Sequence, residues 1–188
     1  MTLQPLGNVQ ARHDAYIKAC VDWNNQKSNG LGESCLLGEL SRIDLLQSQP
    51  KAMINFTNTG FTKLRVPEYL FQKLKKFFDD NKENQTRERW STADIHTNHW
   101  EAPSSFLAIE NNDFAGGGFA LQQQVVNDIR AIIEEWTGQR QVQTSVYGIR
   151  IYKNGSMLAP HVDRNPLISS AIICVDNDLD EPWYVRVG

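Results

Sequence analysis

One histidine and one aspartate in the last third of the sequence have the spacing of a metal-binding pair. His161 and Asp163 are separated by a single residue and follow a predicted turn at Asn154-Gly155. If this stretch is extended, both side chains point the same way, because successive side chains of a strand alternate between faces. One imidazole and one carboxylate are two of the three ligands in the facial set that holds non-haem Fe(II). The pair therefore predicts a metal site.

The residues before this pair make the pattern more specific. The spacing alone decides little, because His99 and Glu101 share it and most histidines have other roles. However, Tyr152, Gly155, His161 and Asp163 together form the pattern Tyr-x-x-Gly-x-x-x-x-x-His-x-Asp. This pattern resembles the metal-binding stretch of the Fe(II)- and 2-oxoglutarate-dependent dioxygenases, in particular of their prolyl 4-hydroxylase-like branch. The resemblance is clearest over residues 142–187 and extends more loosely to residues 61–78.

The resemblance implies an α+β fold built on a double-stranded β-helix, a jelly-roll or cupin-like architecture with its metal at the open end. Short alternating segments in the second half of the chain also indicate a sandwich or small barrel. Helices in the first half would cover one outer face. We expect an N-terminal helical segment at residues 1–50 that packs on a β-helix domain at residues 51–188. With 188 residues, 40% of them hydrophobic, the chain can form one globular unit.

An oxygenase of the hydroxylase type is the function that the resemblance implies. It implies Fe(II) as cofactor, 2-oxoglutarate as cosubstrate and ascorbate as a further cofactor, with an unknown peptide or small molecule as substrate. Peptidyl-prolyl hydroxylation is the expectation from the family branch. His161 would bind the metal as a neutral imidazole, and Asp163 would supply an anionic oxygen.

Three further residues are candidates for the 2-oxoglutarate pocket. Tyr152 matches a family position whose phenol contacts the C5 carboxylate, although a half-buried strand tyrosine would look the same. Ser170 falls near another polar position of that pocket. Arg150 shares a strand face with Tyr152, and a buried guanidinium needs an anion. Arg150 could pair with Asp163, hold a carboxylate or face solvent.

The expected metal site lacks its third ligand. The family pattern continues with a second histidine, followed about ten residues later by a lysine or arginine, but no histidine follows His161. We therefore expect a partial domain, a fragment shortened at its C-terminal end and inactive as written. A substitute ligand could come from His96 or His99, on a polar stretch that could also be a surface loop pinned by Trp100.

A second function remains open for the same residues. The chain could be a non-catalytic cupin-like or jelly-roll binding module, in which His161 and Asp163 are structural. Enzymatic activity is thus an open question at the level of the sequence, and metal dependence of stability would separate the two functions.

Four helices are predicted from apolar residues at helical spacing. The first covers residues 10–26. The second begins at a capping residue, Ser34, and ends at Pro50. The third follows Pro67 and buries one side through apolar residues from Leu70 to Phe78. The fourth covers residues 118–137 and ends before a glycine at 138.

Strands are predicted where apolar residues alternate or run together between turns. In Val146–Tyr152, we expect Tyr147, Ile149 and Ile151 to share one face, with Arg150 and Tyr152 on the other. Residues 81–98 are polar and predicted to form a long loop. The remaining predicted strands are 53–56, 61–66, 106–109, the buried strand 168–175, and 183–187.

Composition excludes several classes of partner. The formal net charge is −3, and the basic residues are scattered, so we expect no nucleic-acid surface. No apolar run approaches the ~20 residues that cross a membrane, and no signal peptide is visible, so we expect a cytoplasmic protein. The three cysteines, Cys20, Cys35 and Cys174, are an odd number and are expected to be buried reduced thiols.

Overall fold

The computed structural model describes residues 14, 18, 22, 31–88, 104–154, 156, 158, 161–163, 165–183 and 185. The chain divides into two compact units. Unit 1 consists of Met1–Ala52, Glu88–Ser104 and Tyr152–Val162, and unit 2 consists of Met53–Arg87, Ser105–Ile151 and Asp163–Gly188.

The long helix of unit 1 is α2, Leu31–Ala52. It begins three residues before Ser34, so the predicted capping role of Ser34 is wrong. It also continues through Pro50, which lies in the last turn. A proline there removes one hydrogen-bond donor close to the end, where the loss interrupts little of the helix. Of the predicted helix at residues 10–26, only Asp14, Lys18 and Asp22 are described, and all three are helical. The remaining residues of that prediction lie outside the described part.

Two amphipathic helices of unit 2 confirm the sequence predictions. Helix α3, Glu68–Asn81, begins directly after Pro67, and its buried apolar residues recur at helical spacing. Helix α4, Phe119–Thr137, ends at Gly138, which has a left-handed backbone (φ +65°). The Gly138 N–H donates to the Glu134 carbonyl at 2.9 Å. A left-handed glycine after the last helical residue commonly makes such a hydrogen bond to a carbonyl of the last turn.

A small antiparallel sheet completes the regular structure of unit 2. Its strands are β1 (Thr86–Arg87), β2 (Ser105–Leu107) and β3 (Ile149–Ile151), in the order β1-β2-β3. A short 3-10 helix, η1 (Lys82–Asn84), precedes β1. The predicted loop at 81–98 is therefore wrong for its first residues, because a two-residue strand is too short to leave a periodic signal.

The register of the sheet assigns its two faces. Leu107 pairs with Ile149, and Phe106 pairs with Arg150. Because directly paired residues lie on the same face, Leu107 and Ile149 share one face, and Arg150 lies on the other.

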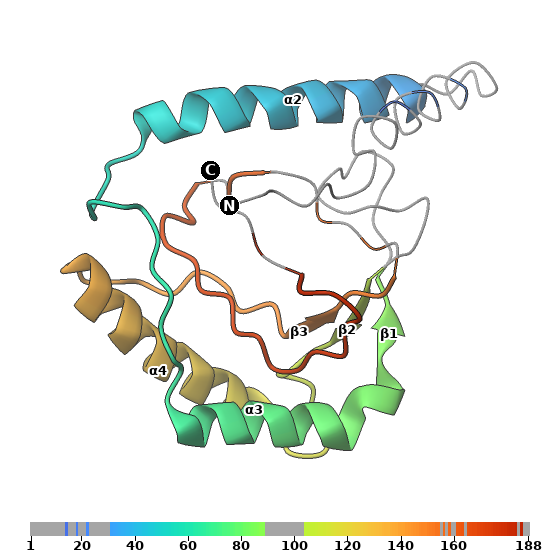
Figure 1. Ribbon diagram of the computed structural model, residues 1–188, viewed down its shortest axis with the longest axis vertical. Coiled ribbons are helices and arrows are strands. Elements are labelled where there is room, and N and C mark those ends of the chain that lie inside the picture. The colour runs from blue at the N-terminus through green and yellow to red at the C-terminus, as the bar shows by residue number, and fades with distance from the viewer. Residues whose placement is uncertain are drawn as a thin grey trace. The chain divides into compact units, whose positions relative to one another are not determined.

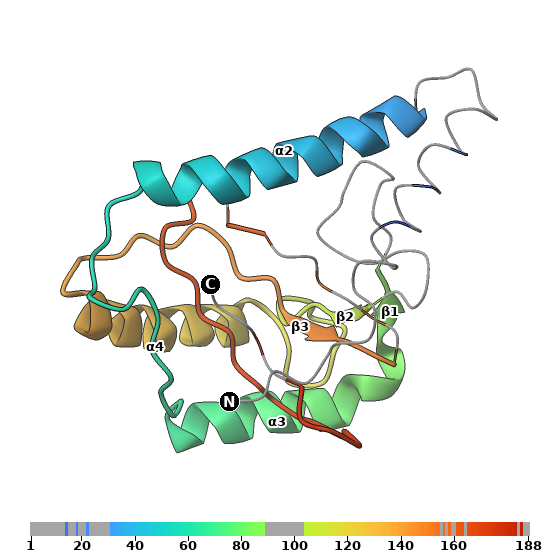
Figure 2. The ribbon, with the colours of Figure 1, turned by 45° about the horizontal axis from the view of Figure 1, so that its top comes forward.

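The core of unit 2 lies between the first of these faces and the two helices, which lie on the same side of β2 and β3 (Figures 1 and 2). Apolar side chains of α3, α4 and β2 are almost fully buried there, and Ile149 and Ile151 of β3 pack against them. The buried members are Leu70, Leu74, Phe77, Leu107, Ile109, Leu121 and Val125. Burial of this apolar surface is the main stabilising contribution to unit 2.

Residues 165–183 run through unit 2 without helix or strand. Strand 168–175 was predicted, but in the described part of the chain these residues join no sheet. Their burial alternates except at Ala171, which is exposed, since the half-buried residues between 167 and 176 are Leu167, Ser169, Ile173 and Val175. Ile173 and Val175 pack against the core, whereas Ile172 is 75% exposed. The segment therefore contacts the core with one side only.

Cys174 corrects a second expectation about this segment. Its thiol is free, as predicted, but exposed rather than buried, because residue 174 falls on the outer side of the alternation. The predicted strands at 53–56 and 61–66 are also absent from the described part of the chain, and most of the strand predicted at 183–187 lies outside the described residues.

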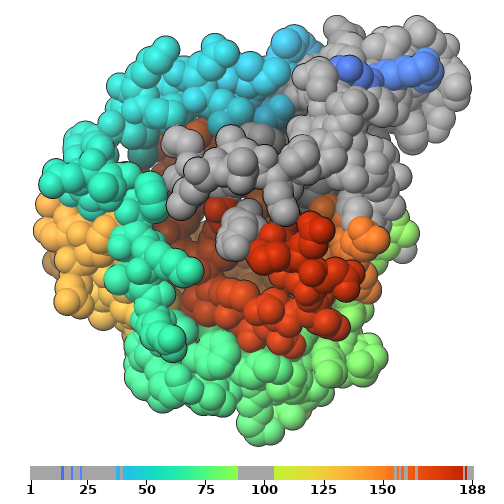
Figure 3. Space-filling model, in the orientation of Figure 1, coloured from blue at the N-terminus to red at the C-terminus, as the bar shows by residue number. Residues whose placement is uncertain are grey.

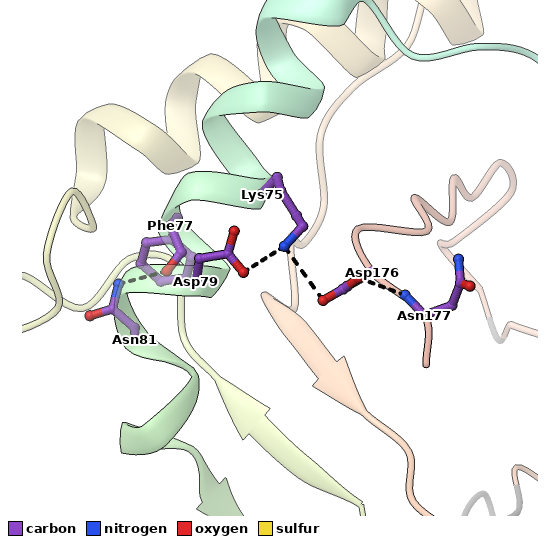
Figure 4. Close-up of polar contacts among 6 residues, drawn as sticks. All are labelled: Lys75, Phe77, Asp79, Asn81, Asp176 and Asn177. Carbon is purple, nitrogen blue, oxygen red and sulfur yellow. Dashed lines mark hydrogen bonds and ion pairs between the residues drawn. The ribbon is translucent and has the colours of Figure 1, made fainter. Parts of the chain in front are cut away.

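An ion-pair network connects this segment to α3 (Figure 4). The Lys75 ammonium lies 2.5 Å from Asp79 Oδ1 and 3.5 Å from Asp176 Oδ2. The hydrogen bond to Asp79 is the main reason that the pKa of Lys75 is raised above its ordinary value. The space-filling view shows the segment (red) against α3 (green) at the surface (Figure 3).

Candidate functional site

Asp163 and Ser170, two of the predicted site residues, are in direct contact in the structure. The Ser170 hydroxyl donates a hydrogen bond to Oδ2 of Asp163. Both residues belong to unit 2, and both are exposed. This contact links the predicted metal ligand to a residue that was expected in the 2-oxoglutarate pocket.

Ser170 and Arg150 are both placed away from the core of unit 2. Arg150 is half-buried on β3, and its pairing with Phe106 puts it on the face opposite Leu107 and the helices. Ser170 is exposed on the outer side of the 165–183 segment, whose inner side packs on the core through Ile173.

His161 and Tyr152 belong to unit 1, and both are half-buried. Tyr152 directly follows β3. The turn predicted at Asn154 is confirmed, since the Ser156 N–H donates to the Lys153 carbonyl at 2.8 Å and the Lys153 N–H donates to Ser156 Oγ at 3.0 Å. The boundary between the units falls between Val162 and Asp163, so the pairing of His161 with Asp163 rests on their spacing in the sequence.

A complete facial set of ligands is not found in the part of the chain that the structure describes. Within that part, no three His, Cys, Asp or Glu side chains are grouped as a metal ion would require. The two substitute ligands that the sequence suggests, His96 and His99, lie outside the described residues. His161 and Asp163 as two of three ligands therefore stay a prediction from the sequence.

A pocket of about 290 Å³ in unit 2 was not predicted from the sequence. It is lined by the chain before α3, by the first turns of α3, and by Ile172, Ile173 and Cys174. None of the predicted site residues belongs to this lining. No sequence signal pointed to it, because its walls come from segments more than a hundred residues apart that carry ordinary apolar patterns.

The contact between Ser170 and Asp163 also escaped sequence reasoning. The only available signal was that both residue types can exchange a hydrogen bond and that seven residues separate them. Seven residues apart, the two side chains would be about 10 Å apart along a helix and on opposite faces of a strand, so they meet only because the chain between them turns back.

Comparison of the chain with protein-family models, with curated proteins and with solved structures found no match. In the described part of the chain, no helix has the length and apolar character needed to cross a membrane.

Proposed function

We propose that the chain is an Fe(II)- and 2-oxoglutarate-dependent oxygenase domain of the hydroxylase type, with a double-stranded β-helix core. His161 and Asp163 would supply two of the metal ligands. The observation that best supports the proposal is the hydrogen bond from Ser170 to Asp163, because ligating carboxylates in metal sites are usually held by such a second contact. The pattern Tyr-x-x-Gly-x-x-x-x-x-His-x-Asp gives the identity of the site.

The available donors fit part of an iron site. Asp163 can offer a carboxylate oxygen, and His161 can offer one ring nitrogen as neutral imidazole. The third ligand would come from His96 or His99. Fe(II) and 2-oxoglutarate, when bound, would supply the oxidative chemistry, whereas the protein would bind, orient and shield them.

Arg150 and Tyr152 are the residues proposed to hold the distal carboxylate of 2-oxoglutarate. Arg150 lies on the sheet face away from the core. A guanidinium binds a carboxylate through two parallel hydrogen bonds, and the Tyr152 phenol can donate a third. The primary substrate is a peptide or small molecule, with a prolyl peptide as the first to test.

The test is a calorimetric titration with Mn(II), which replaces Fe(II) without oxidation, on the full chain. We expect His161→Ala and Asp163→Ala each to remove measurable binding, because each deletes one of few ligands. His13→Ala and Asp180→Ala serve as matched controls, since Asp180 is an exposed aspartate elsewhere in unit 2. Circular dichroism must show that all four variants remain folded. Unchanged Mn(II) affinity in both ligand variants would refute the metal assignment.

A non-catalytic cupin-like binding module is the second candidate. It is favoured by one observation, namely that the described residues group no three metal-binding side chains. In that case His161 and Asp163 would be structural, and 2-oxoglutarate would not be converted to succinate. Release of succinate by the chain supplied with Fe(II), ascorbate and 2-oxoglutarate would exclude this candidate.

A further inference from the structure

The pocket of about 290 Å³ lies within unit 2 and contains none of the residues of the proposed metal site. Its walls come from the chain before α3, from the first turns of α3, and from residues 172–174. Its volume is at the lower end of the range for ligand pockets, roughly 300–1,000 Å³. The size therefore suits a small metabolite rather than a large cofactor.

Most of the side chains that line this pocket are apolar. Val66, Phe71 and Ile173 are half-buried, and Val66 and Ile173 also pack against the core of unit 2. Leu64 and Ile172 are 58% and 75% exposed. Exposed apolar side chains around a hollow are typical of binding sites, because a ligand with an apolar body removes them from water. The lining therefore favours a ligand with an apolar side chain.

Two residues of opposite charge line the same pocket. Arg65 precedes α3, Glu68 is the first residue of the helix, and both are exposed. Among the residues that the structure describes, no ion pair involves either of them. Oε1 of Glu68 accepts a hydrogen bond from the Gln72 amide at 2.7 Å, which orients the carboxylate. A guanidinium binds a carboxylate and a carboxylate binds an ammonium group, so the lining complements a molecule that carries both charges.

We propose that this pocket binds a free aliphatic amino acid. The carboxylate of the ligand would bind Arg65, its ammonium group would bind Glu68, and its side chain would lie against Val66, Phe71 and Ile173. An apolar carboxylate or an apolar amine would use only one of the two charges in the lining. The zwitterion uses both, and for this reason an amino acid fits the pocket better than either.

The experiment measures the binding of leucine to the full chain by calorimetry, together with two analogues that each lack one charge. Isocaproate is leucine without its amino group, and isoamylamine is leucine without its carboxylate. We expect each analogue to bind about fivefold more weakly than leucine, which is the upper end of what an exposed charge pair contributes. No metal is added, because none of the proposed metal-site residues lines the pocket.

Two variants assign the two charges separately. Arg65→Gln should bind leucine and isoamylamine equally, because the carboxylate of leucine then meets no cation. Glu68→Gln should bind leucine and isocaproate equally for the corresponding reason. Lys63→Gln and Glu83→Gln change exposed charged residues of unit 2 outside the lining, so they should keep the preference for leucine. The comparison requires that all four variants give the circular dichroism spectrum of the unmodified chain.

Cys174 reports whether leucine binds in this pocket rather than elsewhere. Its free thiol is exposed and the residue lines the pocket, so N-ethylmaleimide can reach it. Saturating leucine should slow the alkylation of Cys174, which is measured by mass spectrometry of the peptide that contains it. The same concentration of isocaproate or isoamylamine should slow it less.

Two results would overturn the inference. One is that leucine binds no more tightly than isocaproate or isoamylamine, which would mean that the pocket does not recognise both charges. The other is that leucine leaves the alkylation rate of Cys174 unchanged, which would mean that it does not occupy this pocket. Both readouts are independent of Mn(II) binding, so the failure of the proposed metal site would leave this inference standing.

Discussion

At the scale of single residues, Gly148 determines where β3 begins. Its backbone has φ +81°, in the left-handed region that favours glycine. The prediction that Tyr147 shares a face with Ile149 and Ile151 is wrong, because this turn of the backbone interrupts the alternation. Tyr147 is 65% exposed, and Val146 packs against the core instead. A period-two pattern cannot reveal a positive φ, so the error was unavoidable from apolar spacing alone.

Gly148→Ala should destabilise the chain more than Gly60→Ala. Both glycines have positive φ, so each alanine costs about 1–2 kcal/mol of backbone strain. At Gly148 an added Cβ would also lie 2.5 Å from the Leu107 carbonyl oxygen, whereas at Gly60 it would meet no atom within 4 Å. The free energies of unfolding of the two variants in urea give the difference directly. An equal loss of unfolding free energy in the two variants would mean that β2 moves away from the added methyl group without an energetic cost.

The predicted site residues could be chosen from the sequence, but the contact between Asp163 and Ser170 could not. His161 and Asp163 were selected by spacing and chemical type, which depend only on the sequence. The contact of Asp163 with Ser170 depends on the path of the chain between them, which turns back over seven residues. Such a path is set by packing of Ile173 and Val175 on a distant core, and no local pattern encodes it.

At the scale of elements, helices α3 and α4 were predictable and the sheet was less so. A helix satisfies its hydrogen bonds within a local segment, so apolar residues such as Leu70, Leu74 and Phe77 identify it by spacing alone. A strand requires a partner from elsewhere in the chain. Residues 168–175 have the composition and alternation of a strand, yet they pair with no other strand in the described part.

Ile173→Ala and Ile172→Ala test whether this segment packs as its alternation indicates. Ile173 is half-buried against the core, so truncation should cost about 1–2 kcal/mol of unfolding free energy. Ile172 is 75% exposed, and its truncation should change stability by no more than about 0.5 kcal/mol. The unfolding free energies of both variants are measured by urea titration under the same conditions. A larger loss for Ile172→Ala would show that the outer side of the segment is the one that packs.

At the scale of the whole molecule, the double-stranded β-helix remains a prediction. The three-stranded sheet with two helices over one face is compatible with many folds, because this combination recurs wherever a sheet needs one covered face. What the sequence indicated correctly here is that Ile149 and Ile151 share one face of their strand, since both contact the helical core.

Binding of the metal should stabilise the folded chain against thermal unfolding. A ligand that binds only the folded state at 100 times its dissociation constant adds about 2.7 kcal/mol of stability. For a chain of this size each kcal/mol corresponds to about 2–4 °C, so saturating Mn(II) should raise the Tm by about 5–10 °C. Asp163→Ala should abolish this rise, and Asp180→Ala should keep it. Calorimetric melting curves with and without a chelator provide the measurement.

2-Oxoglutarate distinguishes an oxygenase site from a general metal site in the same melting experiment. Because the cosubstrate would bind through the metal in the proposed site, 2-oxoglutarate alone should leave the Tm unchanged, and added after Mn(II) it should raise the Tm further. Arg150→Ala should reduce this second increment without affecting the first, since the guanidinium is proposed to hold only the distal carboxylate. A rise with Mn(II) but no increment with 2-oxoglutarate would favour a metal-binding module, and no rise with either would favour structural roles for His161 and Asp163.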